Sequence, residues 1–569
     1  MSWRENYFER VRPVLGDTLA EGHVFVWGLQ RAHVVAEALA RTGLRQQTFF
    51  DEGEVRPGSA FCRTLGVEHA GRSRTAALEA HIRAHNHFED DWQIASHPHD
   101  SELFSRCCAA SPPRLIVGEL DAQAPGVLRA AMDHHIPAVL TFLPRGSTPS
   151  CLQLVYHPQS TVDRDALLAL TKELATLPAL SEAQGLAAHI EHLEAASMAL
   201  GLCRWLLAPE RPLRPDLAHS IIERGAAIVL RGEPSWPWTV RFARPSHDIA
   251  TLCVGGSARY LPPDALRRST RLLVIGLGTA SLFCGEALGL SKEMILLDGK
   301  EVSPFNPVRQ LYPSSRIGEP KAEALAEVLA RRICKRPEVG AFETLEALKV
   351  LEAGEHRFIN GSLHLSARNA SSKRCFGELL DTLKPDLAVV GMGRSKDDNF
   401  MATTELRKRG IRHVTPTAFP GVSHYKHIVT DGADGPCYDC LQGHLAIDGG
   451  AAPTLSEQER DVFYGGTQPA TLAETLPSAH SLLRLVADLS LPPAARPTYL
   501  RRELASEQNC WVGANRTERL EGGGWLYGVK RPFQLVTYGI GDLVGSRAEQ
   551  RCPCGRVNRV QNVLGRAGL

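Results

Sequence analysis

Two glycines and an aspartate in the second half of the chain have the spacing of a nucleotide-binding site. Gly276-Leu-Gly278 follows an apolar run typical of a buried strand, and a helix is expected to begin directly after it. Glycines let the backbone approach a phosphate, and free N–H groups at a helix start favour negative charge. Asp298 ends the next expected strand, where an acid commonly binds ribose hydroxyls. Because Ser281 replaces a third glycine, a plain NAD site or a structural turn stays open as an alternative.

The residues that follow this pattern add charges that an NAD site does not need. Asn306 is followed by Arg309 and Gln310, and Lys321 and Asp398 come farther along the chain. Activation of an acid by ATP requires cations that neutralise the triphosphate and a carboxylate that holds Mg²⁺ at the reacting phosphate. We assign Arg309 and Lys321 as these cations and Asp398 as the Mg²⁺ ligand.

The combined motifs resemble the adenylation domain of ubiquitin-activating enzymes and of their bacterial ThiF and MoeB relatives. They are Gly276-Leu-Gly278, Asp298, Asn306-x-x-Arg309-Gln310, Gly318-x-x-Lys321 and Asp398-Asn399. The resemblance implies that Asp298 binds the ribose of ATP and that Asp398 binds Mg²⁺. It also implies a phosphate-binding set made of Asn306, Arg309, Gln310 and Lys321. The chain departs from the family in having Ser281 for the third glycine, Lys300 for a second acid and Thr403 for an arginine.

Four cysteines near the C-terminus form two pairs, Cys437 with Cys440 and Cys552 with Cys554. Four thiolates are a common ligand set of structural Zn²⁺. We expect zinc to fasten the C-terminal segment to the core, with no open coordination position for catalysis. A redox pair or buried thiols are the alternative. The resembling family commonly carries two CxxC pairs, and this chain departs from it with CxC in the second.

Ubiquitin-activating enzymes carry the acyl group as a thioester on a cysteine that usually lies between the two zinc pairs. In this chain the only cysteine from Leu441 to Arg551 is Cys510, which is our candidate nucleophile. The alternative is a buried strand residue, because the surrounding NCWVGA segment aligns with the apolar run around Ala226 in the first half. Cys375 is a second candidate.

The chain contains an internal repeat. The segment from His23 to Val55 has the same order of expected strand, turn, helix, strand and acid as the segment from Arg271 to Val302. From Asp51, aligned with Asp298, the register continues without a gap and places Arg74 on Lys321. Each half also contains an apolar helical stretch that we expect in a core or an interface, at residues 186–207 and 477–491.

Both halves alternate strands with helices, which predicts an α/β fold with two tandem Rossmann-like, doubly wound domains. On the family resemblance these are ThiF-type domains, and they are expected to pack as a pseudo-dimer because a duplicated gene inherits the face of an ancestral dimer. The expected domains are an inactive adenylation domain (1–150), its helical and strand completion (151–252), the active adenylation domain (253–450), and a helical segment with the candidate cysteine and the zinc closure (451–569).

The first half has lost most of the nucleotide-binding groups. It keeps Gly28, Asp51 and Arg74. Three other residues replace Gly278, Arg309 and Asp398, namely Gln30, Cys62 and Gln123. We therefore expect the first half to be structural, as in enzymes that join an inactive to an active adenylation domain.

Composition narrows the class of partner. The 64 basic and 63 acidic residues nearly cancel, so no broad positive field favours nucleic acid. No apolar run reaches the length of about 18 residues that a membrane span needs, and the first residues do not have the pattern of a signal peptide. We expect a cytoplasmic protein with no membrane and no nucleic-acid partner.

These expectations combine into one function. The resemblance implies an enzyme that uses ATP and Mg²⁺ to adenylate the C-terminal carboxylate of a ubiquitin-like protein, captures the acyl group on Cys510 and passes it to a conjugating enzyme. A decayed half fused to an active one resembles the activating enzymes of bacterial ubiquitin-like conjugation operons, including those of antiviral defence. The alternatives are a sulfur-carrier adenylyltransferase of the thiamine or molybdopterin type and a non-catalytic scaffold.

Overall fold

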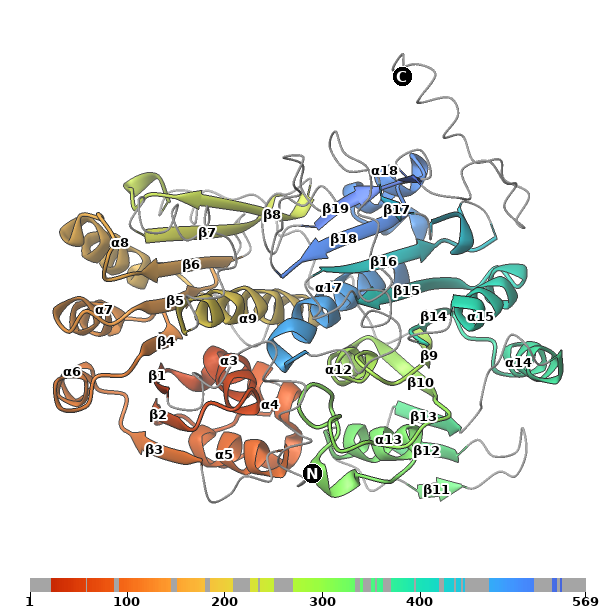
Figure 1. Ribbon diagram of the computed structural model, residues 1–569, viewed down its shortest axis with the longest axis horizontal. Coiled ribbons are helices and arrows are strands. Elements are labelled where there is room, and N and C mark those ends of the chain that lie inside the picture. Colours follow the sequence, from red (N-terminus) through yellow and green to blue (C-terminus); the bar gives the residue numbers. More distant parts are fainter. Residues whose placement is uncertain are drawn as a thin grey trace, which may run out of the picture.

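Two mixed sheets that alternate with helices make up this α/β structure (Figure 1). The computed structural model describes residues 22–57, 59–85, 92–144, 151–179, 185–207, 226–233, 236–249, 270–332, 338–340, 349–353, 356–361, 370–392, 396–418, 424–433, 436–441, 444–445, 470–515, 535–539 and 543–544. The expected domain boundary near residue 252 lies outside these ranges. Among the described helices, none combines the length and the apolar character that crossing a membrane would need.

The first sheet has eight strands in the order β3-β2-β1-β4-β5-β6-β7-β8. Pairing is parallel from β3 to β5 and antiparallel from β5 to β8. The strands are β1 (His23–Trp27), β2 (Gln46–Phe50), β3 (Gln93–His97), β4 (Leu115–Glu119), β5 (Ala138–Phe142), β6 (Cys151–Tyr156), β7 (Ala226–Glu233) and β8 (Trp236–Ala243).

The second sheet has ten strands in the order β11-β12-β13-β10-β9-β14-β15-β16-β18-β19. They are β9 (Thr270–Ile275), β10 (Ser291–Leu297), β11 (Glu338–Gly340), β12 (Lys349–Ala353), β13 (His356–Gly361), β14 (Leu387–Val390), β15 (Arg412–Ala418), β16 (His424–Thr430), β18 (Cys510–Ala514) and β19 (Leu535–Tyr538). A separate small sheet pairs β17 (His444–Leu445) with β20 (Leu543–Val544).

The two sheets repeat one topology. From β13 to β19 the second sheet has the strand order and directions of the first from β3 to β8. The antiparallel strands β11 and β12 are added at one edge of the second sheet. The internal repeat in the sequence therefore corresponds to a repeat of structure.

Helices cover both faces of each sheet, as expected for a doubly wound arrangement (Figure 1). The outer layers are α6 (Ser101–Ala110), α7 (Ala124–Asp133) and α8 (Arg164–Thr176) on the first sheet, and α14 (Ala370–Leu383) and α15 (Lys396–Lys408) on the second. The inner layers are α3 (Leu29–Arg41), α4 (Ala60–Leu65), α5 (Arg74–His85) and α9 (Gly185–Leu207), and α12 (Ala280–Glu286), α13 (Lys321–Arg332) and α17 (Leu472–Ser490). The inner layers share one continuous apolar core, and α18 (Thr498–Ala505) packs at its end.

The apolar helices expected at residues 186–207 and 477–491 are α9 and α17, which pack against each other between the two sheets (Figure 1). α17 begins before the predicted start at Pro477, because Thr471 and Glu474 form a capping box. Buried charges on the helices are paired across the contact, since an unpaired buried charge is costly. The Arg484 guanidinium donates to the Glu194 carboxylate at 2.7 Å.

Because histidines are buried in the second sheet and in the contact between α9 and α17, we expect the fold to be less stable in acid. Burial lowers the pKa of His427 to about 3 and that of His480 to about 4. The unfolded chain binds these protons as pH falls below the ordinary histidine pKa, about 6.5, whereas the folded chain does not, so stability is lost from there downward. At pH 5 each such histidine should contribute about 2 kcal/mol less stability than at pH 7.

Urea unfolding at pH 7 and pH 5 tests this prediction. In His427→Gln the difference in unfolding free energy between the two pH values should shrink by about 2 kcal/mol relative to the parent. An unchanged difference would show that His427 does not titrate in this way.

Candidate functional site

The candidate site lies where the connections of the second sheet change sides. β9 stands between β10 and β14. The chain leaves β9 through α12 on the inner face, whereas α14 and α15 flank β14 on the outer face (Figure 1). In open α/β sheets the carboxyl ends of strands at such a switch point bound a crevice that binds ligands.

The loop after β9 begins with a glycine that no other residue can replace without strain. Gly276 has a φ of 81°, and its N–H donates to the Leu297 carbonyl oxygen at 2.8 Å. A Cβ added at Gly276 would lie 2.2 Å from the Gly391 carbonyl oxygen, in the loop after β14. At Gly278 the nearest atom to an added Cβ is Gln310 Nε2, at 3.8 Å. Gly276 is therefore required by its backbone conformation and its neighbour, whereas Gly278 leaves its surroundings open.

Asp298 follows β10 and fastens the glycine loop. Its Oδ2 accepts a hydrogen bond from the Leu277 N–H at 2.7 Å, and its Oδ1 accepts one from the Lys300 N–H at 2.8 Å. A carboxylate oxygen has more than one lone pair, so both oxygens keep capacity for a ligand hydroxyl. The predicted ribose acid thus lies beside the predicted phosphate loop.

Ser281 and Tyr312 join the glycine loop to the segment that follows Asp298. The Ser281 hydroxyl donates to the Gly278 carbonyl oxygen at 2.7 Å and accepts from the Leu311 N–H at 3.1 Å. The Tyr312 hydroxyl donates to the Leu277 carbonyl oxygen at 2.7 Å. Sequence reasoning treated Ser281 only as a departure from a glycine motif and did not identify Tyr312, because both roles depend on contacts distant in sequence.

The candidate phosphate ligands lie on this fastened segment. Asn306 Oδ1 accepts from the Ser303 N–H at 2.7 Å, so this side chain closes its own turn. Arg309 is half-buried. Gln310 is buried with its amide near Gly278, and its Oε1 has no hydrogen-bond partner among the described residues. Of the predicted set, Gln310 is thus the side chain that the contacts place directly beside the glycine loop.

Lys321 and Asp398 are placed by two further elements. Lys321 is buried at the start of α13, and its N–H donates to the Lys300 carbonyl oxygen at 2.9 Å, which ties it to the turn after β10. Asp398 is half-buried in the first turn of α15. The next residue, Asn399, accepts from the Met392 N–H at 3.2 Å and holds the loop after β14. All the predicted nucleotide-binding residues therefore belong to segments at the carboxyl ends of β9, β10 and β14.

The first half repeats the backbone of this site. Gly28 has a φ of 72°. Asp51 accepts from the Leu29 N–H at 2.7 Å and from the Gly53 N–H at 2.8 Å, as Asp298 does in the second half. Arg74, aligned with Lys321, donates to Asp51 at 3.0 Å. The scaffold of the site is thus present in both halves.

A glutamate fills this scaffold in the first half. Gly118 pairs with Trp27 at the end of β1, as Val390 pairs with Ile275 at the end of β9, so Glu119 takes the place of Gly391. Its side chain lies 3.1 Å from a Cβ built on Gly28, and it accepts from the Arg31 N–H. A carboxylate thus occupies the space against the loop, a feature that the sequence comparison of Gln30, Cys62 and Gln123 did not identify.

One of the two predicted zinc pairs is described. Cys437 and Cys440 are buried, and their Sγ atoms are 3.6 Å apart. Two thiolates bound to one tetrahedral zinc ion at about 2.3 Å lie about 3.8 Å apart, so this pair fits such an ion. Cys552 and Cys554 lie outside the described residues.

Cys510, the candidate nucleophile, is a buried strand residue in this structure. It is fully buried at the start of β18, and burial raises the pKa of its thiol to about 11 although Lys426 opposes the shift. β18 is the fourth strand along the sheet from β9, so about 19 Å separate it from the glycine loop. β18 also has the sheet position of β7, which begins at Ala226, as the buried-strand alternative predicts. Cys375 lies in α14, and its side chain is outside the described set.

We compared the chain with known proteins. No protein-family model matches the chain, and a search of curated proteins finds no match.

Proposed function

We propose that the second half binds Mg·ATP at the carboxyl ends of β9, β10 and β14 and uses it to adenylate a carboxylate. Asp298 binds the ribose, and Asp398 binds Mg²⁺. The phosphates contact the loop of Gly276 and Gly278 and the side chains of Asn306, Arg309, Gln310 and Lys321. The observation that carries the proposal is the interlocked glycine loop. Asp298 accepts from the Leu277 N–H of this loop, and Ser281 and Tyr312 join it to the segment that contains Arg309 and Gln310.

The proposed reaction requires positioning and charge neutralisation. A substrate carboxylate attacks the α-phosphorus, an acyl-adenylate forms and pyrophosphate leaves. The carboxylate is ionised at neutral pH, so no general base is needed. Arg309 and Lys321 would stabilise the charge of the triphosphate. Asp398 would hold Mg²⁺, which would supply positive charge to offset that of the departing pyrophosphate.

The substrate that we propose is the C-terminal tail of a ubiquitin-like protein, with the product passed to a conjugating enzyme. One half that retains the candidate ligands and one half filled by Glu119 support this choice, because they match a pseudo-dimer of active and inactive adenylation domains. A sulfur-carrier adenylyltransferase is less well supported, since that class commonly uses two copies of a single domain. A role in antiviral conjugation, in the cytoplasm where ATP is supplied, is part of the same proposal.

Exchange of labelled pyrophosphate into ATP tests this function. With Mg²⁺ and a candidate ubiquitin-like protein we expect exchange that depends on the carrier's free C-terminal carboxylate. Loss of exchange on blocking that carboxylate as an amide is the matched control. No exchange with any carrier offered would favour the scaffold alternative.

A thioester step would require a cysteine that becomes accessible. Pyrophosphate exchange reports adenylation alone, so Cys510→Ala should leave it within about twofold of the parent. Because Cys510 is buried and distant from the loop, any thiol-sensitive conjugate should also persist in this variant. A thiol-sensitive conjugate on a non-reducing gel that disappears in this variant would contradict the burial argument and identify Cys510 as the nucleophile after all.

We further propose that Cys437 and Cys440 bind zinc together with Cys552 and Cys554. The ion would supply structure only, because four thiolates complete its coordination. The purified protein should contain about one Zn²⁺ per chain, and Cys437→Ser should lose it. Cys284→Ala, which removes another buried thiol, is the control and should retain the metal. Equal zinc content in both variants would refute the assignment.

A further inference from the structure

An arginine of the first half packs against the candidate phosphate-binding segment of the second half, residues 306–310. Arg41 ends α3 and is 1% exposed. Its Nη2 and Nε donate to the Pro307 carbonyl oxygen at 2.6 and 3.1 Å, and its Nη2 also donates to the Gln310 carbonyl oxygen. The guanidinium thus binds two backbone carbonyls that flank Arg309.

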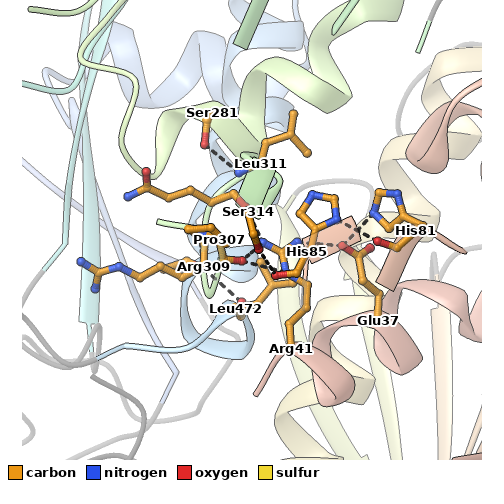
Figure 2. A network of polar contacts seen from close by, with 12 residues as sticks. Glu37, Arg41, His81, His85, Ser281, Pro307, Arg309, Leu311, Ser314 and Leu472 are labelled. Carbon is orange, nitrogen blue, oxygen red and sulfur yellow. Dashed lines mark hydrogen bonds and ion pairs between the residues drawn. The ribbon is translucent and has the colours of Figure 1, made fainter. Parts of the chain in front are cut away.

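The planar fork of arginine suits this task. Five N–H donors in fixed directions let one side chain bind two carbonyl oxygens and a carboxylate at once. Figure 2 shows that Arg41 approaches the segment from one side, while the Arg309 side chain points away from it on the other. The contact therefore fixes the backbone of Arg309 without occupying the direction of its guanidinium.

The first half holds Arg41 itself in place. Its Nη1 donates to the Glu37 carboxylate at 2.7 Å, and Glu37 is also paired with His81 at 3.1 Å (Figure 2). Next to this network the Ser314 hydroxyl donates to the His85 carbonyl oxygen at 2.9 Å, a second contact between the halves. The Glu37 carboxylate thus balances the buried charge of Arg41 and fixes the orientation of the guanidinium before any ligand binds.

The second half has no counterpart of Arg41 in its sequence. The stretch that corresponds to the end of α3, Ala287–Leu290, contains no charged residue. The half with the filled loop therefore contributes an arginine at a position where the half with the open loop has no charged side chain.

We propose that Arg41 is a positioning residue through which the first half holds residues 306–310 in the arrangement that binds phosphate. The ordering of the segment follows from the contacts, whereas the role in phosphate binding rests on the proposed function. In this proposal the first half contributes to the reaction by ordering residues 306–310 at the site of the second half.

Hydrogen exchange of the full-length protein without nucleotide tests the ordering. The Gln310 N–H donates to the Asn306 carbonyl oxygen and the Leu311 N–H to Ser281, so both amides should be protected. Arg41→Met should speed their exchange about tenfold or more, because it removes the anchor of the segment. The control is Arg484→Met, which removes a buried arginine paired across the same contact between halves but away from this segment.

Affinity for Mg·ATP, measured on the same variants, tests the consequence. We expect Arg41→Met to raise the Kd and the KM for ATP about tenfold or more, Arg41→Lys to restore part of the loss, and Arg484→Met to leave both near the parent values. If Arg41→Met does not fold, Arg41→Lys, which keeps the charge and loses the fork, carries the comparison.

Two results would overturn the inference. One is an unchanged rate of hydrogen exchange at the Gln310 and Leu311 amides in the Arg41 variants. The other is an equal increase of this rate in Arg484→Met. Failure of the parent protein to bind Mg·ATP would instead refute the proposed function, and the exchange data would still decide whether Arg41 orders the segment.

Discussion

Asp398→Ala should lower the rate of pyrophosphate exchange by about 100-fold to 1,000-fold while the protein stays folded. Asp398 lies in the first turn of α15, beside the loop that follows β14. Loss of the carboxylate removes the proposed Mg²⁺ ligand, and with it the charge that offsets the leaving pyrophosphate. The effect should appear mainly in kcat, because Mg²⁺ acts most strongly on charge that develops in the transition state.

A second acid of the same helix provides the control. Glu405 is buried, is ion-paired with Lys408 and Arg409, each at 2.9 Å, and lies two turns beyond Asp398. Glu405→Gln should therefore weaken both ion pairs and lower stability, but leave the exchange rate within about twofold of the parent. A similar loss in both variants would indicate damage to α15 and not loss of a metal ligand.

Gly276→Ala should be the most damaging single-methyl substitution in the candidate site. A methyl group at this position meets the Gly391 carbonyl oxygen at 2.2 Å and forces a residue with a side chain into a φ of 81°. The left-handed conformation costs about 1–2 kcal/mol, and displacement of the Gly391 backbone adds to it, so we expect a loss of about 3 kcal/mol in unfolding free energy. The shifted loop should also abolish measurable ATP binding.

Substitutions at two other glycines separate the cost of the left-handed conformation from the cost of the contact with the Gly391 backbone. Gly28→Ala has a similar φ of 72° but meets only the movable Glu119 side chain, so it should cost about 1–2 kcal/mol. Gly278→Ala meets nothing closer than 3.8 Å and should cost about 1 kcal/mol or less. Urea unfolding and nucleotide titration of the three variants test these values. Equal losses of unfolding free energy in Gly276→Ala and Gly28→Ala would show that the contact with the Gly391 carbonyl oxygen does not affect stability.

The repeat, the sheet arrangement and the glycine loop could be predicted from sequence because their signals are local. An apolar run followed by glycine and an acid one strand later fixes where Gly276 and Asp298 lie in any sheet of this kind. The alignment of Asp51 with Asp298 predicts the same loop in the first half. Both aspartates accept the equivalent backbone hydrogen bond, as this alignment predicts.

The remaining features depend on contacts between distant segments. Glu119 fills the first loop only because the end of β4 lies beside Gly28, and Arg41 reaches Pro307 only because the two halves pack together. Neither residue belongs to a motif with local spacing. A pattern in one segment cannot reveal such pairs.

Cys510 shows how two interpretations of one residue arise from sequence. Its position between the two predicted zinc pairs favours a nucleophile, whereas the apolar NCWVGA run favours a strand, and sequence alone does not separate the two. Its complete burial in β18 supports the strand. Chemistry inferred from residue type needs accessibility as well as spacing.

One nucleotide should bind to the chain, in the second half, and titration calorimetry with Mg·ATP on a matched pair of variants measures this. Asp298 and Asp51 make the same backbone hydrogen bonds, and asparagine can retain an acceptor at each. We expect about one site per chain, with affinity reduced about tenfold or more in Asp298→Asn and unchanged in Asp51→Asn. Binding that is lost in Asp51→Asn and kept in Asp298→Asn, or no binding to the parent protein, would contradict it.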